Sequence, residues 1–113
     1  MLSCGVSVDD HRGADSAGWL EDHPRLDYPE GIPEEHPEPW GDAIRYYHLA
    51  VRAEAYSALD WPGSWREAVK NELAARQRRD GSFTNKESHL MKEDDPLLCT
   101  ALAVMALVKS VTR

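Results

Sequence analysis

Apolar side chains recur at every fourth position along residues 64–77. Residues i and i+4 lie one above the other on a helix surface, so this spacing predicts an α-helix with one apolar face. The face consists of Trp65, Val69 and Leu73, followed one turn later by Gln77. Ser64 and Glu67, at the start of this segment, have the S-x-x-E spacing of a capping box, which predicts that the helix begins at Ser64.

A turn is predicted directly after this helix. The chain there reads Gln77-Arg-Arg-Asp80-Gly81-Ser82-Phe83. Asp80-Gly81 supplies the turn, because glycine adopts a positive φ at almost no steric cost. Phe83 is expected to insert into the apolar interior behind it.

Two further helices are predicted upstream. Asp9 and Asp10 form an N-cap pair for a helix over residues 11–23, since carboxylates near a helix start oppose the positive end of its dipole. Its predicted inward side carries Ala14, Ala17 and Trp19-Leu20. A long helix is predicted from Gly41 or Asp42 to Leu59. Its predicted inward side carries Ile44, Tyr47, Val51, Ala55 and Ala58, widened by Ala50 and Ala53.

The most apolar helix is predicted over Leu97–Val111. Asp94 or Asp95 is expected to cap it, with Pro96 at the first helical position. Apolar side chains occupy more than one of its faces: Leu98, Ala101, Leu102, Met105, Ala106 and Val108. A helix that is apolar on several faces is expected to be covered on several sides.

Two long loops separate these helices. The loop over residues 24–41 is rich in proline and glutamate, and proline removes an N–H donor and fixes φ, so an extended chain is predicted. Tyr28, Ile32 and Trp40 are expected to anchor this loop over helix ends. The second loop, over residues 84–95, is polar.

The Gln-x-x-Asp-Gly-Ser-Phe turn between two amphipathic helices resembles the repeat motif of the prenyltransferase and squalene-cyclase repeat family, the α/α toroids. That family usually has Trp where this chain has Phe83. The resemblance continues through Leu73–Gln77 before the turn, through Thr100–Leu107 after it, and upstream in Tyr46-Tyr47-His48. It covers most of residues 42–110 and, more weakly, residues 1–23.

The resemblance implies an all-α fold built from helical hairpins in the α/α-toroid style. The whole chain, residues 1–113, would be one partial toroid domain of about two repeats with four main helices. Repeat unit one is expected over residues 1–60, including the loop over 24–41, and unit two over residues 61–113. Arg12 and Arg66 open corresponding outer helices in the two units.

Inner helices of a closed toroid are flanked on both sides, and two units alone cannot provide this. Met1–Val6 is expected to be the last turn of an inner helix, so the chain is interpreted as the C-terminal repeats of a larger toroid; a frayed terminus is the alternative. The flanks of Met1–Val6 and Leu97–Val111 would be uncovered. Large apolar patches are seldom left in water. We therefore expect a homo-oligomer formed through exposed inner helices, or a rearrangement of the terminal helices.

The amino-acid composition argues against some classes of binding partner. The net charge of −7 over 113 residues argues against a nucleic-acid surface, which needs a basic stripe, and against an anionic membrane. No apolar run reaches the ~20 residues of a membrane span. The first residues lack the features of a signal peptide, so a cytoplasmic location is expected. Cys4 and Cys99 are interpreted as buried free thiols in a reducing compartment.

No catalytic, cofactor or metal residue is predicted. Cys4, His48, His89, Asp95 and Cys99 are the available ligands, and they do not have the spacing that protein prenyltransferases of this superfamily use. The acidic runs Asp9-Asp10 and Glu93-Asp94-Asp95 lack the Asp-x-Asp-Asp form of cyclase acids. Both runs stand where helix caps are needed.

Trp40, Tyr46, Tyr47 and Phe83 are the candidate site residues, as the lining of an apolar pocket or as contacts between repeats. Three functions stay open. The first is a non-catalytic scaffolding or binding module of a prenyltransferase/squalene-cyclase-like protein. The second is the C-terminal part of a terpenoid cyclase or prenyltransferase-like enzyme, which would bind an apolar or isoprenoid ligand near Tyr47. The third is a small homo-oligomeric helical binding protein.

Overall fold

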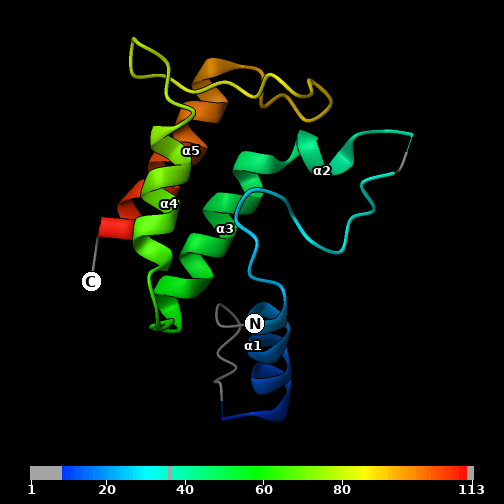
Figure 1. Cartoon of the computed structure of the whole chain (residues 1–113), viewed down its shortest axis with the longest axis vertical. Helices are drawn as coiled ribbons and strands as arrows, with labels where there is room; N and C mark the ends of the chain where they lie inside the picture. Colours follow the sequence, from blue (N-terminus) through cyan, green and yellow to red (C-terminus); the bar gives the residue numbers. More distant parts are fainter. Residues whose placement is uncertain (1–8, 36, 112–113) are drawn as a thin grey trace.

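The computed structural model describes residues 9–35 and 37–111. Within these ranges all regular secondary structure is helical, which confirms the predicted all-α class (Figure 1). The helices are α1 (His11–Asp22), α2 (Trp40–Ala43), α3 (Arg45–Ala58), α4 (Trp65–Ala74) and α5 (Pro96–Val111). The predictions for Met1–Val6 and Cys4 concern residues outside the described ranges.

Helices α3, α4 and α5 form the packed body of the molecule. The chain runs down α3, back up α4 and down α5, so that α3 and α5 run in the same direction side by side (Figure 1). Helix α1 lies beyond the lower part of this body, and a long irregular segment joins it to α2. None of the described helices combines the length and the apolar content needed to cross a bilayer.

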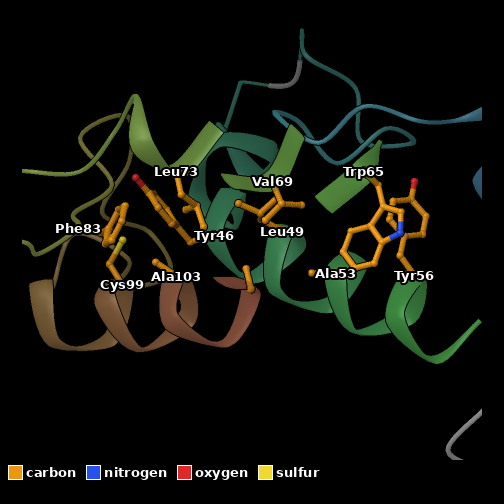
Figure 2. Close-up of a cluster of buried hydrophobic side chains, with 11 residues drawn as sticks. Tyr46, Leu49, Ala53, Tyr56, Trp65, Val69, Leu73, Phe83, Cys99 and Ala103 are labelled. Atoms are coloured by element: carbon orange, nitrogen blue, oxygen red, sulfur yellow. The ribbon is translucent and has the colours of Figure 1, made fainter. Parts of the chain in front are cut away.

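The core is a layer of aromatic and small side chains between these three helices (Figure 2). Its members are Tyr46, Leu49, Ala53 and Tyr56 of α3, Trp65, Val69 and Leu73 of α4, Cys99, Ala103 and Ala106 of α5, and Phe83 from the connecting loop. Alanines dominate the α3–α5 side of this layer. Small residues allow two helix backbones to approach closely, which explains the extensive contact between α3 and α5.

The predicted long helix from residue 41 or 42 to Leu59 is wrong in two respects. Ile44 has φ −116° and ψ 24°, which interrupts the helix and separates α2 from α3. The inward face is also displaced, because α3 buries Tyr46, Leu49 and Ala53 whereas Tyr47 and Val51 are exposed. Apolar side chains occur on both sides of this helix, so their spacing alone favoured the wrong side.

The predictions for α4 and α5 are mostly confirmed. Trp65, Val69 and Leu73 are buried as expected. The capping box is wrong, because Ser64 has φ −100° and ψ 27° and its side chain makes no cap bond. An N-cap side chain reaches the first free N–H groups from an extended backbone, which Ser64 lacks.

The start of α5 is confirmed. Helix α5 begins at Pro96, and Asp95 Oδ1 accepts a hydrogen bond from the Leu97 N–H at 2.9 Å.

Helix α1 is capped by Asp10, which accepts a hydrogen bond from the Arg12 N–H at 2.9 Å, as predicted. Its inward face differs from the prediction, because Ala14 and Trp19 are exposed. Trp19 instead stacks on His23 with 3.9 Å between ring centroids. Leu20 is the predicted inward residue that packs against the core.

The loop between α1 and α2 is held at one predicted anchor. The ring of Tyr28 is buried and occupies the space where a side chain at Gly41 would be, so Gly41 must be a glycine. Arg25 lies over this ring, with 5.2 Å from its guanidinium carbon to the ring centroid. Trp40 is not an anchor, because 42% of its surface is exposed.

Candidate functional site

The motif residues form one closed turn between α4 and the following loop. Gln77 Nε2 donates to the Gly81 carbonyl at 2.9 Å, and Asp80 Oδ1 accepts from the Ser82 N–H at 3.0 Å and from its hydroxyl at 2.6 Å. Gly81 has φ +89°, as the predicted turn requires. These bonds also keep the pKa of Asp80 below its ordinary value, mainly through the Ser82 hydroxyl.

Phe83 joins this turn to α5. Its ring is buried, and its backbone N–H donates to Thr100 Oγ1 at 2.9 Å. The motif therefore connects the end of α4 to the first turns of α5 through a hydrogen bond and a buried ring.

The four candidate aromatic residues do not gather in one place. Tyr46 and Phe83 meet edge to face in the core, with 6.1 Å between ring centroids (Figure 2). Burial raises the pKa of Tyr46 to about 12. Trp40 and Tyr47 lie on the surface, and 55% of Tyr47 is exposed. The structure thus separates this set into two core residues and two surface residues.

A buried carboxylate from the acidic run before α5 lies at the start of α3. Glu93 is only 2% exposed, and its two oxygens accept hydrogen bonds from the backbone N–H groups of Tyr46 and Tyr47, each at 2.8 Å. Helix α3 has no side-chain cap of its own. Glu93 therefore caps α3 from a loop that is remote in sequence, where the positive end of the helix dipole favours it.

Asn85 completes this arrangement. Its side-chain amide donates to the Asp42 carbonyl at 2.6 Å and to Glu93 at 3.1 Å, and its oxygen accepts from the Glu87 N–H. Its backbone N–H bonds to the Glu93 carbonyl. The donors and acceptors of the Asn85 side chain are thus used to hold the second loop against α2 and α3.

A second buried polar cluster surrounds Arg52 on α3. Its guanidinium donates to His48 Nε2 at 3.0 Å, to the Tyr56 hydroxyl at 2.8 Å and to the His23 carbonyl at 2.7 Å. The bond to His23 attaches the end of α1 to α3. Burial, with the charge of Arg52 as the second cause, lowers the pKa of His48 to about 4. Structural bonds thus account for Glu93, Asn85 and Arg52, whereas Nδ1 of His48 is buried without a hydrogen-bond partner among the described residues.

The remaining reactive groups lie in different surroundings. Cys99 is a free, buried thiol, as predicted, and burial raises its pKa to about 12, so little thiolate is available for chemistry. In the described part of the chain no three His, Cys, Asp or Glu side chains are grouped to hold a metal ion.

The feature without a structural explanation is an apolar surface on α5 and α3. We call it the α3–α5 face and define it by its large exposed side chains, Tyr47, Val51, Leu97, Leu98, Val104, Met105 and Val108. Leu97 is 81% exposed and Met105 is 52% exposed. Helix α5 has no charged residue from Pro96 to Val108, so its outward side is as apolar as its buried side.

A shallow groove of about 300 Å³ lies within this face, between the two parallel helices. It is lined by Ala50, Glu54, Val104, Met105, Val108 and Lys109. Glu54 and Lys109 are its charged members, and neither side chain makes a hydrogen bond or an ion pair within the described residues. The groove is therefore an apolar trough with one unpaired charge of each sign.

A comparison with known protein families, curated proteins and solved structures finds no match for this chain.

Proposed function

We propose that this chain is a non-catalytic helical-repeat module of the prenyltransferase/squalene-cyclase type, and that it works by docking another α-helical surface on the α3–α5 face. The observation that carries the proposal is the outward side of α5. A helix that is apolar all round is a buried helix in folded proteins, and an apolar patch of more than a few hundred Å² on a soluble protein marks a contact site.

The shape of the face fits a helix better than an extended peptide. Its members on α5, Leu97, Val104 and Val108, follow helical spacing, with Ala101 between them. Two parallel helices with a groove between them accept the side-chain ridge of a third helix by ridges-into-grooves packing. An added β-strand would need an exposed sheet edge, and the described residues include no strand.

Three features support the repeat type. Helices α3, α4 and α5 alternate in direction, and the parallel helices α3 and α5 pack directly against each other with α4 antiparallel to both. The Gln77–Phe83 turn forms a closed hydrogen-bonded unit at the junction where the resembled family has its motif. The resemblance implies a further inner helix beside α5, and the outward side of α5 carries exposed apolar side chains that such a helix would cover.

The positions of the carboxylates support a non-catalytic role. Asp10 and Asp95 cap α1 and α5, Glu93 caps α3, and Asp80 closes the motif turn. Each of these groups is bonded to a helix end or a turn. The pKa values of Asp10 and Asp80 lie below the ordinary value, mainly through hydrogen bonds to Arg12 and to Ser82, and such carboxylates are poor general acids near neutral pH.

Site-specific crosslinking tests the docking role. A benzophenone amino acid at Met105, on the face, is compared with one at Met91, which is similarly exposed in the second loop. We expect Met105 to crosslink efficiently in cells, with attachment points on the captured chain that follow helical spacing. Equal yields at both positions, or attachment only to an isoprenoid lipid, would contradict the docking role.

A further inference from the structure

We infer that the surface docked on the α3–α5 face is the same face of a second copy of this chain, in a two-fold dimer in which Glu54 of each copy pairs with Lys109 of the other. This inference rests on the proposed docking function and adds the identity and orientation of the partner. Its first support is the unpaired charges in the groove. Glu54 contributes the anion and Lys109 the cation, and they lie on opposite sides of the groove, on α3 and α5.

A patch that carries one charge of each sign is complementary to itself. In a two-fold interface, if residue i contacts residue j, then j contacts i, so one Glu54–Lys109 contact creates a second. The net charge of −7 makes two copies repel each other as wholes. The groove itself is locally neutral, so it is a place where two acidic copies can meet without like charges in contact.

The charges also select the orientation of the axis. Among the residues that line the groove, Glu54 is the most C-terminal on α3 and Lys109 is the most C-terminal on α5. Because α3 and α5 run in the same direction, both residues lie toward the same end of the groove. A two-fold axis that runs along the groove lays α5 of one copy over α3 of the other, which brings Lys109 above Glu54. An axis across the groove lays α3 over α3, and each Glu54 then stays away from Lys109.

This orientation also covers the apolar members of the face. With α5 over α3, Val51 and Tyr47 of one copy lie under the outward side of α5 of the other. These two residues are the large apolar side chains that α3 leaves exposed. One contact therefore covers the exposed sides of both helices.

A charge-swap series on the purified full chain tests this inference by sedimentation velocity over a range of concentrations. Glu54→Lys and Lys109→Glu each replace two attractive pairs by two repulsive ones, and we expect each to raise the dimer Kd about tenfold. The double variant E54K/K109E restores both pairs, so its Kd should return to within about threefold of the wild-type value. Higher salt should reduce the differences between single variants and wild type.

Two controls separate the possible failures. Met105→Glu places a charge in the centre of the face and should abolish any dimer formed there, whereas Met91→Glu should leave it intact. A wild-type chain that stays monomeric while Met105 crosslinks to a helix of another protein overturns the inference and keeps the docking function. A dimer that the double variant does not restore overturns the proposed orientation, and a monomer without Met105 crosslinks overturns both proposals.

Discussion

Glu93 accepts a hydrogen bond from the backbone N–H of Tyr46, a residue 47 positions earlier in the chain, at 2.8 Å. This bond joins the second loop to the first turn of α3. It supplies the cap that the N-cap residue of α3 does not provide. It also holds the loop that leads into α5 beside the first turn of α3. The parallel pair of α3 and α5 is thus aligned at its upper end by one carboxylate.

Replacing Glu93 by glutamine is expected to destabilise the fold by about 2 kcal/mol. The amide group of glutamine presents a donor to one of the two backbone N–H groups, so one charge-assisted hydrogen bond is lost, and such bonds contribute ~1.5–3 kcal/mol. Urea unfolding followed by circular dichroism measures the change. The matched control is Asp94→Asn, because Asp94 is exposed and its side chain caps nothing. A similar loss in both variants would show that Glu93 is not a cap.

Gly81→Ala is expected to destabilise the fold by about 1–2 kcal/mol, because Gly81 has φ +89° and an L side chain is strained there. Space is not the cause, since the added Cβ would lie 3.8 Å from Gln77 Nε2. Gly18→Ala is the control in α1. It meets no atom within 4 Å, and it should increase helix stability by up to ~1 kcal/mol. Opposite signs in thermal unfolding would confirm that conformation, rather than space, requires Gly81.

The free energy of unfolding should decrease as the pH is lowered from about 6.5 to about 4, because His48 titrates at different pH values in the folded and unfolded chain. The pKa of His48 is about 4 in the folded chain, against an ordinary value of 6.5. The unfolded chain therefore binds more protons between these values, and the contribution of His48 is complete above pH ~6.5 and is lost as the pH falls towards ~4. Asp27 opposes this shift, and burial and Arg52 cause it.

His48→Gln tests this pH dependence. Glutamine can still accept the Arg52 hydrogen bond but does not titrate. The difference in unfolding free energy between wild type and variant should change between pH 6.5 and pH 4 and stay constant from pH 7 to pH 8. A constant difference over the whole range would exclude His48 as the cause.

Cys99 is expected to react with a thiol reagent only when the core opens. Its side chain is buried between α3, α4 and α5, and its pKa of about 12 leaves little thiolate. In a Cys4→Ala background, the reaction of the folded chain with Ellman's reagent should be at least ~100-fold slower than that of the chain unfolded in urea. Fast labelling without denaturant would contradict the burial of this helix face.

Local signals explain the parts of the fold that the sequence predicts well. The four-residue spacing of Trp65, Val69 and Leu73, the Asp95-Pro96 helix start and the Asp80-Gly81 turn each depend on neighbouring residues, and the structure confirms all three. The sequence does not show which of Tyr46 and Tyr47 is buried, because adjacent residues on a helix point in different directions and both are aromatic. Burial selected Tyr46, and Tyr47 became part of the exposed face.

The buried polar residues could not be predicted in the same way. The Arg52 guanidinium bonds to the His23 carbonyl, 29 positions away, and Asn85 bonds to the Asp42 carbonyl, 43 positions away. A sequence contains no spacing rule for such partners. The need for Glu93 as a cap arises only from the break at Ile44, which no proline or glycine marks.

The alanine seam between α3 and α5 restricts how this protein can change. Ala53 and Ala103 are fully enclosed where the two helices meet, so a single added methylene would push the backbones apart. Room for variation is left on the opposite side of each helix. Directed evolution of new binding preferences in this scaffold should therefore recover changes on the outer surface of α5 and almost none along its alanine-lined inner edge.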